Sequence, residues 1–167
     1  MRVGILTGGG DCPGLNAVIR GIVKRATKDV EIIGFMYGWK GIIDGEYTFL
    51  TDDDVEGIHI LGGTILGTSR TNPLRNEESK NKVIENYQKL ELDALIAIGG
   101  DDTLSVAARY SAMGLNVVGV PKTIDNDVAN TDYTFGFHTA VNVGADAIDR
   151  LHSTAKSHRR IIFVELM

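Results

Sequence analysis

A chain of 167 residues with 43% hydrophobic and 23% charged residues has the composition of a folded globular domain, which excludes a fibrous or fully disordered protein. Its 22 acidic and 17 basic side chains give a formal charge of −5, which excludes a general binder of nucleic acids or anionic membranes. The single cysteine, Cys12, excludes an internal disulfide framework and is typical of a reducing compartment. No apolar run approaches the roughly 20 residues of a membrane span, so we expect a cytoplasmic protein.

Short apolar runs alternate with helical patterns along the whole chain. The apolar runs predict strands buried on both faces, at residues 3–7, 30–36, 94–98, 117–120 and 161–166. Apolar residues at helical spacing predict helices at residues 15–26, 77–91, 103–113 and 136–157. This alternation predicts an α/β fold: a doubly wound, mostly parallel sheet with helices on both faces.

The length of the chain suits one domain with a substantial core, and the sequence contains no linker. The chain stops directly after the predicted strand 161–166, without the polar tail that usually trails from a domain. We therefore expect residues 1–167 to be one domain of a longer protein. The alternative is a domain that simply ends on a strand.

Glycine makes up 20 of the 167 residues, about twice the usual share of roughly 7%, and many glycines follow the predicted strands. In a doubly wound sheet, the loops that follow the strands meet at one edge, where ligands bind. The first such loop, residues 7–14 (TGGGDCPG), leads into a helix, whose start favours an anion. It lacks the lysine of a Walker A loop and the third glycine of a dinucleotide fingerprint, so a plain tight turn is the alternative to a phosphate site.

Two further loops carry carboxylates. Asp101 and Asp102 follow two glycines, and one of these carboxylates could support Mg²⁺, whereas a helix N-cap is the alternative. In residues 121–127 (PKTIDND), Asp125 and Asp127 stand beside a lysine and a threonine, a combination that can bind a hydroxyl nucleophile and accept its proton. The alternative for this third loop is an Asx-type turn.

Together, three such loops at one sheet edge predict a site for phosphate and metal. Arg70 lies in a separate loop, 68–73, and is either a solvated charge or a bidentate phosphate clamp.

The chain resembles the N-terminal half of a phosphofructokinase from ILTGGGD at residues 5–11 to VELM at residues 164–167. The segment PKTIDND, followed by TDYTFGF at residues 131–137 and AIDRL at residues 147–151, is highly specific for that family. The resemblance implies a homo-oligomeric, Mg²⁺-dependent phosphotransferase, a dimer or tetramer, that acts on fructose 6-phosphate. It implies that residues 1–167 bind the donor phosphates and carry the catalytic groups, while a further domain supplies much of the sugar-phosphate site.

The resemblance also implies roles for the acceptor side of the site. Asp125 would be the base that takes the proton from the sugar 1-hydroxyl, with Asp127 supporting it and Thr123 in contact with the substrate. Arg160 would reach the sugar 6-phosphate of a neighbouring subunit, and Met167 would open the sugar-binding loop.

On the donor side, the resemblance implies a magnesium site at Asp101 and an arginine, Arg70, that braces the transferring phosphoryl group. Relatives that use ATP typically carry glycine in place of both Asp102 and Lys122, whereas similar proteins with these two side chains use inorganic pyrophosphate. Asp102 adds bulk and charge on the path of a nucleotide α-phosphate, and Lys122 adds a point cation for a small anion. The residues implied to bind the donor are Gly9, Gly10, Gly100, Asp102 and Thr103.

The resemblance thus favours pyrophosphate as the donor. An ATP-dependent phosphofructokinase is the alternative, and a phosphate-binding module without catalysis is a more distant one.

Overall fold

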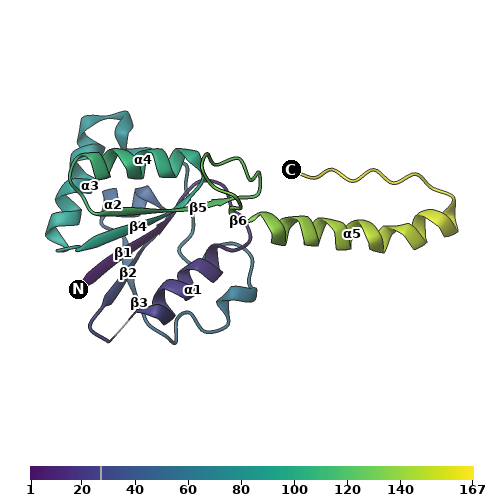
Figure 1. Ribbon diagram of the computed structural model, residues 1–167, viewed down its shortest axis with the longest axis horizontal. Coiled ribbons are helices and arrows are strands. Elements are labelled where there is room, and N and C mark those ends of the chain that lie inside the picture. The colour runs from purple at the N-terminus through teal and green to yellow at the C-terminus, as the bar shows by residue number, and fades with distance from the viewer. Residues whose placement is uncertain (27) are drawn as a thin grey trace.

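The computed structural model describes residues 1–26 and 28–167, and its described part contains a six-stranded sheet in the order β3-β2-β1-β4-β5-β6 (Figure 1). The strands pair in parallel except for β3, which runs antiparallel to β2 at one edge. Their bounds are β1 Arg2–Thr7, β2 Glu31–Phe35, β3 Tyr47–Leu50, β4 Ala94–Gly99, β5 Val117–Thr123 and β6 Phe135–Gly136.

Helices cover both faces of this sheet. The α-helices are α1 Leu15–Arg25, α2 Trp39–Asp44, α3 Glu77–Lys89, α4 Asp101–Ala112 and α5 Phe137–His158, and the 3-10 helices are η1 Ile58–Ile60 and η2 Pro73–Arg75. One buried cluster joins the sheet to α1 and η1, and a second joins it to α2, α3 and α4. Figure 1 shows α1 on one side of the sheet and α4 on the other. The predicted doubly wound architecture is confirmed.

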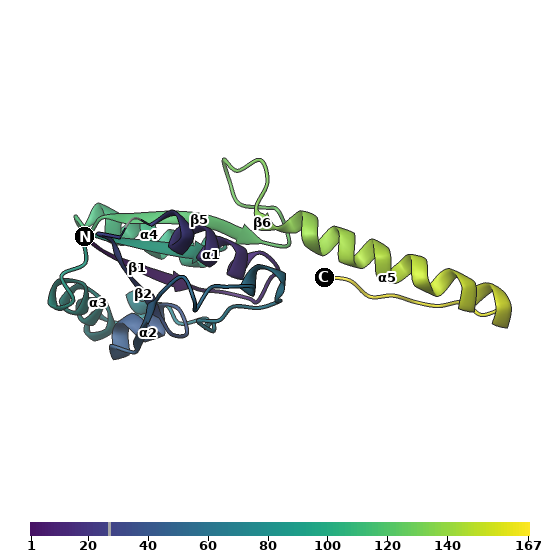
Figure 2. The ribbon, with the colours of Figure 1, turned by 90° about the horizontal axis from the view of Figure 1, so that it is seen from below.

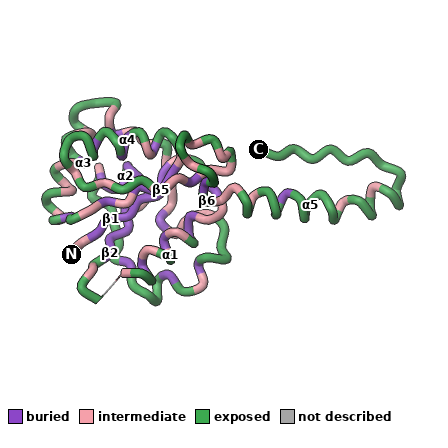
Figure 3. The backbone as a smooth tube through the Cα atoms, viewed as in Figure 1, coloured by how far each residue is buried: buried purple, intermediate pink, exposed green. Residues whose placement is uncertain are grey.

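The strands supply the core of both layers because successive side chains of a strand point to opposite faces. In β1, Val3 and Ile5 belong to the cluster under α1, whereas Leu6 belongs to the cluster under α2 to α4. Purple, buried backbone is accordingly concentrated in the sheet (Figure 3). Both faces of β1, β2 and β4 are largely covered, as their apolar runs predicted. The expectation of burial on both faces is wrong for residues 117–120 of β5, where Val118 and Gly119 are exposed.

The sequence predicted four strands and four helices close to their observed bounds, but one predicted strand is wrong. Residues 161–166 are extended and mostly exposed, and they pair with none of the strands in the described ranges 1–26 and 28–167. An apolar run favours extended backbone, but a strand also needs hydrogen-bonding neighbours. The sequence analysis also missed the short helix α2 and the edge strand β3, which follow one another within residues 39–50.

The helix α5 leaves the body of the domain, and residues 160–167 return alongside it (Figures 1 and 2). Gly144 is the single residue of α5 that is fully buried. Among the described residues, no helix is both long enough and apolar enough to cross a membrane.

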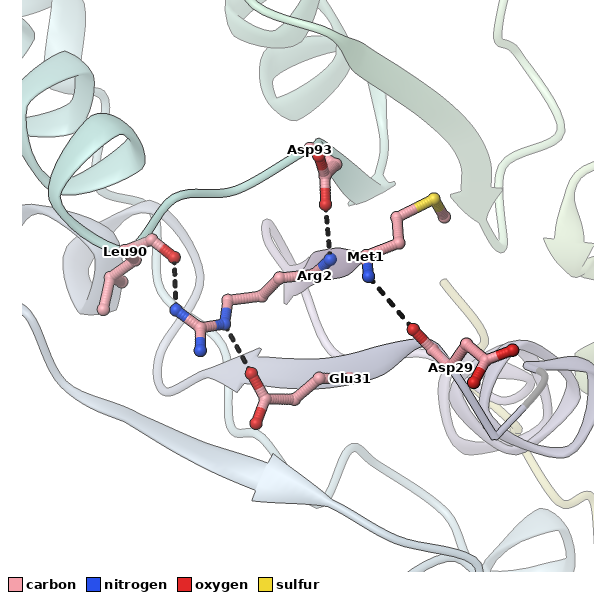
Figure 4. A network of polar contacts seen from close by, with 6 residues as sticks. All are labelled: Met1, Arg2, Asp29, Glu31, Leu90 and Asp93. Atoms are coloured by element: carbon pink, nitrogen blue, oxygen red, sulfur yellow. Dashed lines mark hydrogen bonds and ion pairs between the residues drawn. The ribbon is translucent and has the colours of Figure 1, made fainter.

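The amino ends of the strands are joined by polar contacts of Met1 and Arg2 (Figure 4). The Arg2 guanidinium donates to the Glu31 carboxylate of β2 and to the Leu90 carbonyl, and the Arg2 backbone N–H donates to Asp93. The Met1 amino group donates to the Asp29 carbonyl. Because these groups are largely exposed, we expect the network to add little to stability. It lies at the edge of the sheet opposite to the loops that follow β1, β4 and β5.

Ile5 offers a direct test of the core. It is 0% exposed in the central strand β1, so Ile5→Ala is expected to lower the free energy of unfolding by about 2–5 kcal/mol. Val118→Ala is the control, because Val118 is 52% exposed in β5 and its truncation should change stability by less than about 0.5 kcal/mol. Urea denaturation measures both. Equal losses in the two variants would contradict the assigned core.

Candidate active site

The loops after β1, β4 and β5 open into one cleft of about 480 Å³. The cleft lies at the carboxyl ends of the parallel strands, where doubly wound sheets bind ligands. Every residue that the sequence analysis proposed for the site lines this cleft except Arg160: Gly9, Gly10, Arg70, Gly100, Asp101, Asp102, Thr103, Lys122, Thr123, Asp125, Asp127 and Met167. Arg160 instead lines a separate groove between α5 and the returning tail.

Thr103 brings the first two loops together. Its side chain is buried in the first turn of α4, and its hydroxyl would lie 2.6 Å from a Cβ atom placed on Gly8 and 2.6 Å from one placed on Gly99. Real Cβ atoms do not approach this closely, so a side chain at either position would force Thr103 or the loop to shift. The Gly8 N–H also donates to the carbonyl of Ile98 at 2.9 Å. The glycine loops are therefore packed directly against the start of α4.

The N-terminus of α4 opens into the cleft without a side-chain cap. Gly100 occupies the N-cap position, and Asp101 and Asp102 are exposed in the first turn. The alternative interpretation of these aspartates as N-caps is therefore wrong. Because the first N–H groups of a helix have no acceptor within the helix, this terminus can donate hydrogen bonds to an anion in the cleft.

Lys122, from β5, places a cation on the floor of the cleft. Its side chain is 3% exposed, and its ammonium Nζ donates to the carbonyl oxygen of Gly10 at 2.5 Å. Burial lowers the pKa of Lys122 below its usual range, although nearby Cys12, Asp11 and Asp125 oppose that shift. The chain thus carries a partly desolvated positive charge beside the first glycine loop, where an anionic ligand would relieve the cost of burial.

Hydrogen bonds within residues 123–134 hold the third loop. The Asp125 N–H donates to the Thr123 hydroxyl at 3.2 Å, and the Asn126 amide oxygen accepts from the Thr134 N–H at 2.9 Å. The buried Thr134 hydroxyl donates to the Thr123 carbonyl at 2.7 Å. The bond that bends this segment is accepted by the Thr123 hydroxyl and not by an Asp or Asn side chain, so the segment does not form the Asx-type turn that was the alternative. The exposed carboxylates of Asp125 and Asp127 line the cleft.

Arg70 enters the cleft from a loop that is hydrogen-bonded to the first glycine loop. The Thr68 hydroxyl donates to the Gly9 carbonyl at 2.7 Å, and the Gly9 N–H donates to the Ser69 carbonyl at 3.1 Å. The guanidinium of Arg70 itself is exposed and pairs with no carboxylate of the described residues. It is available to an anion in the cleft.

The sequence analysis missed three side chains that line the cleft: Trp39, Arg75 and Val106. Trp39 begins α2 directly after Gly38, which has φ +66°, so β2 is followed by the same strand–glycine–helix pattern as β1 and β4. That repeat was the signal that could have revealed Trp39. Arg75 and Val106 carry no comparable pattern in the sequence.

The carboxylates of the cleft suit Mg²⁺, which prefers oxygen ligands. Within residues 1–26 and 28–167, no three His, Cys, Asp or Glu side chains gather in a metal-binding cluster. Mg²⁺ is commonly held by one or two carboxylates together with phosphate oxygens and waters. The exposed carboxylate of Asp101 at the start of α4 can serve as such a ligand.

A glycine-lined cleft with a helix N-terminus, a buried lysine and several carboxylates, at the carboxyl ends of the strands of an α/β domain, is the kind of site that can bind a phosphate. The chain matches the family model described as phosphofructokinase over residues 2–167. It is 59% identical to the pyrophosphate–fructose 6-phosphate 1-phosphotransferase of Dictyoglomus thermophilum, over 100% of this chain and 49% of that relative. It is 54% identical to ATP-dependent 6-phosphofructokinase 3 of Streptomyces coelicolor, over 100% of this chain and 50% of that relative.

The chain therefore belongs to the phosphofructokinase family, whose members are phosphotransferases, as the sequence motifs indicated. Its fold is similar to that of phosphofructokinase from Saccharomyces cerevisiae, with a TM-score of 0.81, 29% identity and coverage of 95% of this chain and 25% of that one. The chain spans about half the length of the curated relatives it matches.

The close approach of Gly8 to Thr103 leads to a prediction about stability. Gly8→Ala is expected to lower the free energy of unfolding by about 1–3 kcal/mol, because the added Cβ lies 2.6 Å from the Thr103 hydroxyl. Gly10→Ala is the control, since a Cβ there meets nothing within 4 Å. In a Thr103→Ala background the cost of Gly8→Ala should shrink, and an undiminished cost in urea denaturation would contradict the proposed clash.

Burial of Lys122 leads to a prediction about pH. Since its folded-state pKa is lowered, the unfolded chain holds this proton to higher pH than the folded chain does, so stability rises as pH increases between the two pKa values. The stability of the unchanged chain relative to that of the Lys122→Met variant is therefore expected to increase from pH 7 to the alkaline range.

The exposed Lys82 provides a matched control for this pH dependence. A hydrogen bond that the Lys82 ammonium donates to the Glu78 carboxylate raises the pKa of Lys82, so its contribution to stability is lost as pH rises through that raised value. Lys82→Met should therefore show the opposite pH trend. Parallel trends in the two variants, measured by urea denaturation, would contradict the burial of the Lys122 charge.

Proposed function

We propose that this chain is the donor-binding and catalytic domain of a pyrophosphate-dependent phosphofructokinase. It would transfer a phosphoryl group from Mg²⁺-pyrophosphate to the 1-hydroxyl of fructose 6-phosphate, giving fructose 1,6-bisphosphate and phosphate. The observation that carries the proposal is that Lys122, Asp102 and Asp125 line the same cleft.

Charge and space in the cleft favour a small, dense anion as the donor. The buried ammonium of Lys122, the exposed guanidinium of Arg70 and the N-terminus of α4 all offer positive potential to phosphate oxygens. Asp102, in the first turn of α4, adds bulk and negative charge where a longer donor would pass. In the first glycine loop, the Gly9 N–H is already bonded to the Ser69 carbonyl. Gly10 faces open space and is therefore the better backbone contact for phosphate.

The third loop supplies the chemistry on the acceptor. Asp125 takes the proton from the sugar 1-hydroxyl as that oxygen attacks the nearer phosphorus of pyrophosphate, and the bridging P–O bond breaks to release phosphate. Thr123 positions the carboxylate of Asp125 through their mutual contacts, and Asp127 supports Asp125 in its role as the base. Mg²⁺, held by Asp101, would neutralise charge on the phosphate oxygens. Positioning and neutralisation supply most of the catalysis, with a general base contributing about 10²–10⁴-fold.

The acceptor site extends beyond this cleft in the proposal. Arg160 lies in the groove between α5 and the tail. In the proposal, the protein is a homo-oligomer and Arg160 reaches the sugar phosphate bound by a neighbouring subunit. Met167 lines the cleft from the tail. Since the chain spans about half the length of its relatives, we expect the 167 residues alone to bind the donor with negligible turnover. A cytoplasmic location accords with such an enzyme.

ATP is the alternative donor, and one observation favours it. ATP-dependent 6-phosphofructokinases 2 and 3 of Streptomyces coelicolor are 53% and 54% identical to this chain, close to the pyrophosphate-dependent relatives. An ATP-dependent enzyme would have to accommodate the Asp102 carboxylate beside the nucleotide phosphates.

Calorimetric titration with Mg²⁺-pyrophosphate and Mg²⁺-ATP tests the choice of donor. The unchanged chain is expected to prefer pyrophosphate, and Asp102→Gly should move the ratio of the two dissociation constants about fivefold to tenfold toward ATP, which corresponds to about 1 kcal/mol of relieved repulsion. Asp53→Gly removes the same charge outside the cleft and should leave the ratio unchanged. Preference of the unchanged chain for ATP, or an unmoved ratio in Asp102→Gly, would count against the proposal.

A further inference from the structure

The first glycine loop and the Arg70 loop are joined by a two-bond clasp. The Thr68 hydroxyl donates to the Gly9 carbonyl at 2.7 Å, while the Gly9 N–H donates to the Ser69 carbonyl at 3.1 Å. Both polar backbone groups of Gly9 are therefore bonded to residues 68 and 69. Arg70 is the next residue along the chain.

The clasp belongs to a longer chain of contacts across the cleft. Gly10, which follows Gly9, accepts a hydrogen bond from the Lys122 ammonium at 2.5 Å. On its other side, the Ser69 hydroxyl donates to the Tyr37 carbonyl at 2.6 Å. Two of the three cations that line the cleft, Lys122 and Arg70, are thus connected to neighbouring residues of one glycine loop, Lys122 directly and Arg70 through the two residues that precede it. Their separation depends on the register between Gly9 and Thr68.

The remainder of the Arg70 loop is anchored independently of Thr68. The buried Thr7 hydroxyl bonds to the Gly67 carbonyl at 2.7 Å and lies 3.0 Å from the Thr64 hydroxyl. The buried Asn16 side chain accepts from the Ile65 N–H at 2.8 Å. Loss of the Thr68 hydroxyl therefore leaves the loop attached to the domain and affects mainly the register of its last residues.

We propose that Thr68 is a positioning residue for the phosphate donor: its hydroxyl sets Arg70 at the distance from Lys122 that a pyrophosphate bound across the cleft requires. Thr68 does not line the cleft, so it acts through Gly9 and Arg70. The inference rests on the proposed function, because it takes pyrophosphate as the anion that bridges the two cations. Without the Thr68 hydroxyl, one of the two bonds between this segment and Gly9 is lost and only the bond from the Gly9 N–H to the Ser69 carbonyl remains. Arg70 is then held less closely to its place, and part of its contribution to binding is lost.

Calorimetric titration of the 167-residue chain with Mg²⁺-pyrophosphate tests the inference. Thr68→Val, which keeps the shape of the side chain and removes its hydroxyl, is expected to weaken binding about fivefold, the effect of one hydrogen bond. Thr68→Ser should restore the affinity. Thr64→Val is the matched control: it removes another hydroxyl contact of the same loop, away from Gly9, and should lower stability without weakening binding.

A double-mutant cycle separates positioning of Arg70 from a general structural role. In an Arg70→Ala background, Thr68→Val is expected to cause no further loss of affinity, because the residue that it positions is gone. The inference is overturned if Thr68→Val binds like the unchanged chain, if Arg70→Ala binds like the unchanged chain, or if Thr68→Val loses the same factor with and without Arg70. If the unchanged chain fails to bind pyrophosphate, the proposed function falls, and this inference falls with it.

Discussion

The buried bond between the Lys122 ammonium and the Gly10 carbonyl is the interaction on which the site depends. It connects the end of β5 to the loop after β1. The strands β1 and β5 do not pair with each other, because β4 lies between them. Burial makes the charge costly, as the lowered pKa of Lys122 shows, and one carbonyl satisfies only one of its three N–H donors. A small anion in the cleft can satisfy the others. The unfavourable burial of one charge therefore becomes affinity for a ligand of opposite charge.

The rest of the cleft follows from the way its loops are packed. Thr103 fills the space beneath Gly8 and Gly99, which brings the N-terminus of α4 against the first glycine loop. Thr134 holds the loop of Asp125 through backbone contacts, so the carboxylates of that loop stay in the cleft that Lys122 and Arg70 also line. Lys122 and Asp125 come from the end of β5 and the loop that follows it, whereas Arg70 comes from a different loop. Such an arrangement suits phosphoryl transfer, in which the donor needs cations and the attacking hydroxyl needs a base.

Sequence patterns predicted the fold well where local rules decide the structure. Apolar runs followed by glycines marked β1 and β4, an apolar run marked β5, and the position of the loops after them at one edge followed from the parallel topology. Residues 161–166 could not be predicted in the same way, because pairing depends on a neighbouring strand and not on the apolar run itself. Trp39, Arg75 and Val106 reach the cleft through the tertiary packing of α2, η2 and α4, which a single sequence does not reveal. The burial of the Lys122 side chain could not be predicted from the sequence either and is evident only in the structure.

The most direct test of the central claim is the number of protons taken up when Mg²⁺-pyrophosphate binds at alkaline pH. It is obtained by calorimetry in buffers of different ionisation enthalpy. A lysine whose pKa is lowered by burial should regain its proton beside the anion, so the unchanged chain should take up more protons than Lys122→Met. Equal proton uptake in the two chains would show that the Lys122 charge does not meet the ligand, and would contradict this account of the site.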